Sequence, residues 1–165
     1  MDRKIGIRLI IIMVIILTTL QSEDYYRIKN KWSKEYISIL TKKKSSFIFK
    51  NNLGVLILEK KINPKYNGAQ WIIEKRRNGN IRLKNKLTLQ YIHNSYTLDS
   101  IELSQRPFKA QDWILEPAKF SGYYRIKNSL THKYMHIENR LGHIQLINNV
   151  PGNWWSALWT LEKVK

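Results

Sequence analysis

The chain has 165 residues, of which 43% are apolar and 12% aromatic, so it is long enough for one domain with a core and too apolar for a disordered chain. It has no cysteine, which excludes disulfide bonds, thiol chemistry and cysteine-based metal sites. Lys and Arg outnumber Asp and Glu by 29 to 12, and the resulting formal net charge of +17 favours anionic partners without indicating a fold.

The first 22 residues differ from the rest of the chain. Basic residues precede an apolar run from Leu9 to Leu17, which passes through two threonines to the small, polar Ser22. This order is typical of a secretory signal peptide, and the run is shorter than the roughly 20 apolar residues that an uncleaved membrane anchor needs. We therefore expect cleavage near Ser22, a secreted mature chain over residues 23–165, and no stable insertion in a membrane.

Residues 25–75 contain four short runs that read as strands. In the first run Tyr26 and Ile28 fall on one face while Arg27 and Lys29 fall on the other, which is the period of a half-buried strand. Segments rich in Asn, Gly and Pro separate the runs and favour turns. We expect strands over residues 25–29, 36–39, 55–58 and 71–74.

Residues 79–117 and 122–163 repeat this order. Each copy begins with a strand that ends in Arg-x-Lys-Asn, has a tyrosine six positions after the asparagine, and closes with a strand that starts at a tryptophan. The repeated residues are Asn30, Asn85 and Asn128, then Tyr36, Tyr91 and Tyr134, then Trp71, Trp113 and Trp159. A period of roughly 40 to 50 residues indicates a small unit that must pack on its copies to bury its apolar face.

Three units of four strands predict an all-β domain over residues 23–165 without a clear helix. The strands expected in copies two and three span 81–84, 91–93, 100–103, 113–116, 123–127, 134–138, 143–147 and 158–162. Propellers also use four-stranded units, but they close their ring with four or more blades. Three copies therefore favour a β-trefoil with pseudo-three-fold symmetry, in which the closing tryptophans pack with Ile28, Leu83 and Ile126.

The repeated pattern Asn-x-x-Ser/Thr-x-x-Tyr, followed by a closing Trp strand, resembles the ricin B-type β-trefoil lectins over nearly the whole mature chain. The third copy is most similar to the form appended to secreted bacterial polysaccharide-degrading enzymes. The resemblance implies carbohydrate binding without catalysis, at up to three shallow sites. The galactose-binding copies of that family carry an aspartate where this chain has Ser38, His93 and His136, so the usual galactose geometry does not follow from the resemblance.

Copy three carries the densest set of candidate sugar contacts. A sugar site combines an aromatic ring for the C–H face of a pyranose with polar groups for its hydroxyls. His136 and Glu138 alternate onto one strand face, and Trp154 and Trp155 precede the closing strand. An aromatic residue stands five positions before every closing tryptophan, which indicates a partly structural role for Trp154, whereas Trp155 has no counterpart. We expect these four residues to contact carbohydrate, with Trp155 as the leading aromatic candidate.

Nothing in the sequence predicts an enzyme. The acidic residues are scattered, and the three histidines of copy three lack the spacing and the partners of a zinc site. No phosphate-binding loop or nucleophile motif is present. We therefore expect no catalytic residue, no metal and no cofactor, with glycans or glycoconjugates as partners and no specific nucleic acid.

The charge leaves a second function open. Copy one holds a ten-residue insertion around residues 41–46, for which we expect an extended hairpin with a basic tip. Its lysines and one that follows would bind a heparin-type acidic polysaccharide or an anionic cell surface, as in a growth-factor-like trefoil. These are Lys42, Lys43, Lys44 and Lys50. A toxin or immune effector would instead use the sugar site to reach a cell, and only polyanion binding would fall steeply with added salt.

Overall fold

The computed structural model describes residues 23–40, 54–95, 99–106, 108–138 and 143–165. The expected signal peptide over residues 1–22 and the insertion with Lys42, Lys43, Lys44 and Lys50 lie outside the described residues. Within the described ranges, no helix has the length and apolar character needed to cross a bilayer.

Each copy contributes four strands, and the fold is an all-β β-trefoil. The strands of copy one are β1 (Tyr25–Asn30), β2 (Tyr36–Leu40), β3 (Val55–Glu59) and β4 (Trp71–Lys75). Those of copy two are β5 (Ile81–Asn85), β6 (Tyr91–Asn94), β7 (Ile101–Ser104) and β8 (Trp113–Pro117). Those of copy three are β9 (Tyr124–Asn128), β10 (Tyr134–Glu138), β11 (His143–Ile147) and β12 (Trp159–Lys163). Every strand begins and ends within one residue of its predicted bounds.

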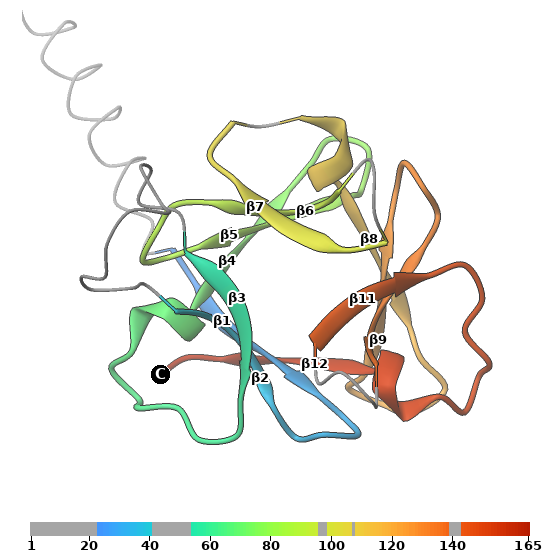
Figure 1. Cartoon of the computed structure of the whole chain (residues 1–165), viewed down its shortest axis with the longest axis horizontal. Helices are drawn as coiled ribbons and strands as arrows, with labels where there is room; N and C mark the ends of the chain where they lie inside the picture. Colours follow the sequence, from blue (N-terminus) through green and yellow to red (C-terminus); the bar gives the residue numbers. More distant parts are fainter. Residues whose placement is uncertain (1–22, 41–53, 96–98, 107, 139–142) are drawn as a thin grey trace, which may run out of the picture.

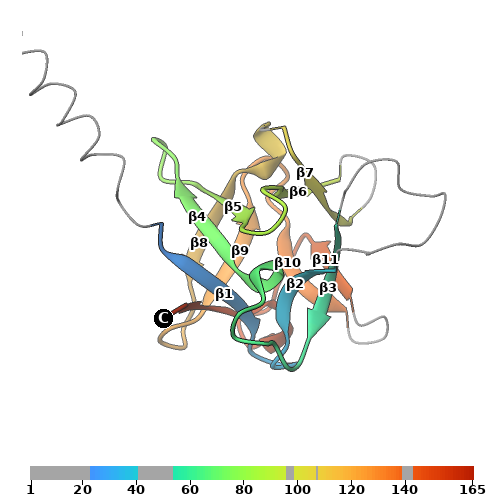
Figure 2. The same ribbon diagram turned by 90° about the vertical axis from the view of Figure 1, so that its left-hand side faces the viewer.

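Six of the strands form a closed barrel. Strand β1 pairs with β4, β4 with β5, β5 with β8, β8 with β9, β9 with β12, and β12 with β1 again. The remaining strands pair as the hairpins β2–β3, β6–β7 and β10–β11. Figure 1 shows three lobes around a common axis. In Figure 2 the hairpins lie toward one end of the barrel, and the C-terminus and the start of β1 lie at the other.

The three closing tryptophans form the core, as the repeat predicts. All three are fully buried, and so are Ile28, Leu83 and Ile126. Each indole N–H donates a hydrogen bond to a backbone carbonyl of the hairpin in its own copy: Trp71 to Ile37 (3.0 Å), Trp113 to Ile92 (3.1 Å) and Trp159 to Met135 (2.9 Å). The indole thus fills the core and ties the hairpin to the barrel, which a phenyl ring could not do.

Three short 3-10 helices, which the sequence did not predict, precede the closing strands. They are η1 (Asn67–Ala69), η2 (Lys109–Gln111) and η3 (Trp155–Ala157). Each turns the chain into its Trp strand, and the residue that follows the helix donates its backbone N–H to the first helical carbonyl.

A buried asparagine joins copy two to copy one. The side-chain oxygen of Asn85 accepts hydrogen bonds from the backbone N–H groups of Leu87 (2.9 Å) and Thr88 (3.2 Å). Its side-chain nitrogen donates to the carbonyl of Gly68 in η1 (2.9 Å). One side chain therefore fixes the turn after β5 and docks that turn on the helix of the preceding copy.

The same arrangement recurs at the other two copy boundaries. Asn128 accepts from Leu130 and Thr131 (both 3.1 Å) and donates to Ala110 (2.8 Å), and Asn30 accepts from Trp32 (2.9 Å) and Ser33 (3.2 Å) and donates to Ser156 (2.8 Å). Because Ser156 belongs to η3, Asn30 joins the first copy to the last and completes the ring.

Replacing Asn128 by alanine tests this joint. The change removes the acceptor for Leu130 and Thr131 and the donor for Ala110, all at a side chain with no exposed surface. Because each buried group left unpaired costs about 1–3 kcal/mol, we expect the free energy of unfolding to fall by about 2–4 kcal/mol in urea denaturation. Asn78→Ala, in an exposed turn, is the control and should change it by less than about 0.5 kcal/mol. Equal losses in the two variants would contradict the assignment.

Candidate functional site

A cavity of about 440 Å³ opens where copy three meets copy one. Strand β10 lines it with His136, Ile137 and Glu138, and the segment at η3 lines it with residues 153–156. Trp32, in the turn after β1, closes the opposite side. The cavity thus brings together the four residues that the sequence singled out in copy three, and adds a tryptophan from copy one.

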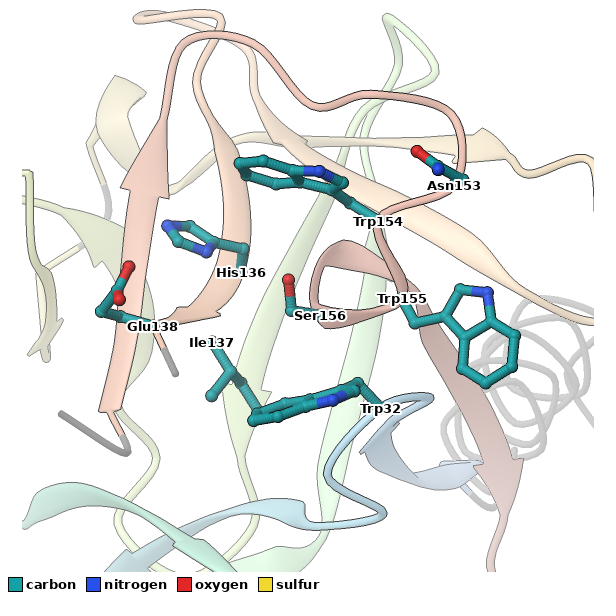
Figure 3. A pocket seen from close by; sticks show the side chains of 8 residues that line it. All are labelled: Trp32, His136, Ile137, Glu138, Asn153, Trp154, Trp155 and Ser156. Atoms are coloured by element: carbon teal, nitrogen blue, oxygen red, sulfur yellow. The ribbon is translucent and has the colours of Figure 1, made fainter. Parts of the chain in front are cut away.

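Two indole rings face each other across this cavity. In Figure 3 the ring of Trp154 lies above the opening and the ring of Trp32 below it, with His136 and Ser156 between the two levels. The exposed fraction is 40% for Trp154 and 45% for Trp32. Large aromatic faces left open to solvent around a concave, partly polar surface are typical of a ligand site.

His136 is the most buried polar residue in the cavity lining, with an exposed fraction of 5%. Burial lowers the pKa of its imidazole below the ordinary value of 6.5, and the negative charge of Glu138 offsets this only in part. The ring is therefore neutral at neutral pH and carries one N–H donor and one acceptor nitrogen. One ring nitrogen is hydrogen-bonded to the backbone of Ile137, which leaves the other nitrogen to accept from a hydroxyl group in the cavity.

Trp155 borders the cavity, but its ring points away from the other lining side chains (Figure 3). The ring meets Phe120 edge-on, with centroids 6.4 Å apart and planes at 86°. The ammonium of Lys31 lies 4.9 Å from the centroid of Trp155. The ring that faces the cavity is therefore that of Trp154, and Trp155 packs on the neighbouring surface.

The ammonium of Lys31 sits among three aromatic rings. Besides Trp155, it lies 3.3 Å from the centroid of Phe120 and 4.5 Å from that of Tyr123. Cation–π contacts of this kind are individually worth roughly 0.5–2 kcal/mol. Because Lys31 directly precedes Trp32, the contacts hold one wall of the cavity against copy three.

The equivalent aromatic residues of copies one and two lie against their own hairpins. In copy one the Tyr66 hydroxyl donates to the carbonyl of Ile39, and a Cβ on Gly68 would come within 2.5 Å of the Tyr66 ring. In copy two Phe108 packs on His93 with ring centroids 4.8 Å apart. These rings bridge the helix to the hairpin and take up space that copy three leaves open.

Copy three is more open at the same place. The ring centroids of Trp154 and His136 are 6.4 Å apart, with the planes tilted by 42°. The residues at the family's aspartate positions, Ser38, His93 and His136, are all buried. Of the three, His136 belongs to the lining of the open cavity.

The sequence analysis did not identify Trp32 as a site residue. The signal was in the repeat, because the position two after the repeated asparagine is tryptophan in copy one and leucine in the others, Leu87 and Leu130. A departure from the repeat at an exposed position is a mark of function. Trp32 becomes part of the site only because copy one contacts copy three. The hydrogen bond from Asn30 to Ser156 makes this contact, and the repeat alone does not predict it.

No group of three or more His, Asp or Glu side chains that could hold a metal ion lies together within the described parts of the chain. The polar groups of the cavity are an imidazole, a carboxylate, an amide and a hydroxyl, from His136, Glu138, Asn153 and Ser156. This set can bind hydroxyl and amide groups, and the indoles can cover apolar surface.

Solved structures share this fold. A GlcNAcα1-4Gal releasing endo-β-galactosidase from Clostridium perfringens is 25% identical, with a TM-score of 0.69 over 86% of this chain and 33% of that chain. The designed three-fold symmetric protein ThreeFoil is 14% identical, with a TM-score of 0.67 over 84% of this chain and 97% of that one. SeviL bound to asialo-GM1 saccharide is 14% identical, with a TM-score of 0.66 over 87% of this chain and 100% of that one.

The chain spans about a third of the endo-β-galactosidase, since it covers 33% of that protein. No protein-family model matches the sequence, and no curated protein matches it. The likeness to ThreeFoil and SeviL, at 14% identity, establishes the β-trefoil fold and nothing further about the site.

The state of His136 can be measured directly. We expect its ring to titrate with a midpoint below 6.5, because burial disfavours the charged form. In the window from pH 6.5 down to that midpoint the unfolded chain binds more protons than the folded one, so this residue makes the fold less stable as the pH falls. NMR titration of the ring C–H signals, assigned with His136→Gln, measures the midpoint, and a value at or above 6.5 would contradict this description.

Proposed function

We propose that the protein is a secreted, ricin B-type lectin-like module, which binds carbohydrate in the copy-three cavity and catalyses no reaction. The observation that carries the proposal is the pair of indole rings, Trp32 and Trp154, on opposite sides of a cavity lined by hydrogen-bonding side chains. A pyranose combines apolar C–H faces with a rim of hydroxyls, and this lining offers a partner for each.

Different side chains of the cavity would contact the apolar and the polar groups of a sugar. An indole face buries apolar C–H groups and adds a specific ring contact, while the nitrogen of His136 that is not bonded to the backbone of Ile137 accepts from a hydroxyl. The carboxylate of Glu138 is an acceptor that two sugar hydroxyls can share. Ser156 and Asn153 add hydrogen-bonding groups at the η3 side of the cavity.

Two of the solved neighbours support a sugar as the ligand. One is described as releasing GlcNAcα1-4Gal and the other is bound to the saccharide of asialo-GM1. The lysines of the polyanion alternative, Lys42, Lys43, Lys44 and Lys50, lie outside the described residues, and several of the described lysines have acidic partners. Lys29, Lys84 and Lys127 pair with Glu162, Glu74 and Glu116, at 3.6, 3.5 and 3.3 Å.

A glycan array run at low and at high salt tests the proposed function. We expect binding to neutral glycans that persists at high salt, since exposed charge contacts are screened and stacking is not. Trp154→Ala should weaken this binding at least about tenfold, because an aromatic anchor in a binding site is commonly worth 2 kcal/mol or more.

Trp155→Ala is the matched control, since it removes the same side chain from the next residue. Its ring faces away from the cavity, and Lys31 keeps its contacts with Phe120 and Tyr123. We expect it to retain most of the affinity. Binding only to acidic glycans that disappears at high salt, or equal losses in both variants, would refute the carbohydrate site.

A further inference from the structure

A second hollow lies at the turn between β4 and β5. It has a volume of about 580 Å³ and is lined by Lys75, Arg76, Arg77 and Asn78 of the turn and by Asp112, which precedes β8. The two hollows share no lining residue among those that the structure describes. Three of these five side chains are cationic, so positive charge gathers around the second hollow.

The carboxylate of Asp112 leaves this charge in place, because it already has a partner. Its Oδ1 atom lies 2.6 Å from the Nε atom of Arg82, and both side chains are mostly buried, with exposed fractions of 16% and 10%. A guanidinium and a carboxylate at hydrogen-bond distance balance each other. The three cations of the turn are therefore not neutralised by the acidic residue beside them.

Lys75, Arg76 and Arg77 have no acidic partner within the part of the chain that the structure describes. All three are exposed, whereas a lysine of the neighbouring strand, Lys84, pairs with Glu74 at 3.5 Å. Like charges on consecutive residues repel one another, and an anion placed among them removes that repulsion. The hollow therefore favours a negatively charged ligand.

The backbone of this turn is held in one shape. The N–H group of Arg76 donates to the carbonyl of Asn80 at 2.8 Å, and that of Gly79 donates to the carbonyl of Arg76 at 3.1 Å. Gly79 has a φ of 82°, which residues with a side chain rarely adopt. A backbone that is fixed before binding loses less entropy when a ligand enters.

The repeat does not require so much charge at this place. The equivalent turn between β8 and β9, over residues 118–123, carries one cation, Lys119, and its Phe120 packs on Trp155. The strands on either side pair in the same way in both cases. Since the fold forms this turn with a single cation, the run from Lys75 to Arg77 serves something other than folding.

We propose that this hollow binds the negatively charged groups of an acidic polysaccharide, its sulfates or carboxylates. An arginine presents paired N–H donors that match two oxygens of such a group. Among its described lining residues there is neither an aromatic ring on which a nucleic-acid base could stack nor an apolar side chain that could enter a membrane. A polysaccharide needs neither. The inference adds a second site to the chain and does not rest on the sugar cavity.

Heparin hexasaccharide, titrated into the protein by calorimetry at low salt, tests the site. Replacing Arg76 and Arg77 together by glutamine should weaken binding at least about fivefold, because two charge contacts are lost and each is modest when exposed. Replacing Lys60 and Lys61 together by glutamine is the control, since it removes the same charge from another exposed pair. We expect the control to change the affinity less than about twofold, and both variants to keep the unfolding midpoint.

The outcomes are distinct from those of the proposed function. No loss in the arginine variant, or equal losses in the two variants, would overturn the site. So would single-stranded DNA that binds as tightly as the hexasaccharide and loses as much in the arginine variant. Trp154→Ala should leave the heparin affinity unchanged, and the arginine variant should keep its binding to neutral glycans. Either site can therefore fail while the other stands.

Discussion

A buried asparagine side chain at each copy boundary is the interaction on which the rest of the structure depends. The turns after β1, β5 and β9 contain residues with left-handed φ that are not glycine, Lys34 (63°), Leu89 (58°) and His132 (59°). Such residues are strained, and they persist only where surrounding bonds hold the turn. Asn30, Asn85 and Asn128 supply those bonds with one oxygen and use the amide nitrogen to reach the helix of the preceding copy. Turn shape and copy docking are therefore set by a single side chain.

The three copies are more alike in their buried residues than in their exposed ones. A change at a buried asparagine or closing tryptophan would leave hydrogen-bonding groups unpaired, so all three copies keep the same residue there. At the position two after the asparagine and at the position before each 3-10 helix, the side chain takes no part in the asparagine hydrogen bonds, and the residue differs among the copies. Tyr66 and Phe108 lie on their hairpins, whereas Trp154 stands over an open cavity. A symmetric scaffold can thus carry one asymmetric site.

The sequence predicted the parts of the structure that repeat. Alternating apolar residues and the recurring Trp strands are strong signals, and they located the strands to within one residue. The sequence did not predict the 3-10 helices, because three residues are too few to show a helical period. The sequence favoured Trp155 over Trp154 as the ring in the site because Trp154 has aromatic counterparts in the other copies and Trp155 has none. Trp154 is the extended residue that precedes η3 and Trp155 is the first residue of the helix, and their side chains point in different directions, with Trp154 toward His136 (Figure 3).

A binding site in this fold would be built at the boundary between two copies, from residues of both. Each boundary joins the turn that holds the residue two after an asparagine to the 3-10 helix that an aromatic residue precedes. The two residues are Leu87 and Tyr66, Leu130 and Phe108, and Trp32 and Trp154. Only the last pair of these three supplies two indoles, and it forms where β1 meets β12 and the ring closes. A sugar held there contacts both ends of the chain, so it binds the closed barrel and not the unfolded chain, and its binding stabilises the fold. One such site, the number found among the described residues, gives no avidity by itself, so tight attachment to a glycan surface would require several chains in one assembly.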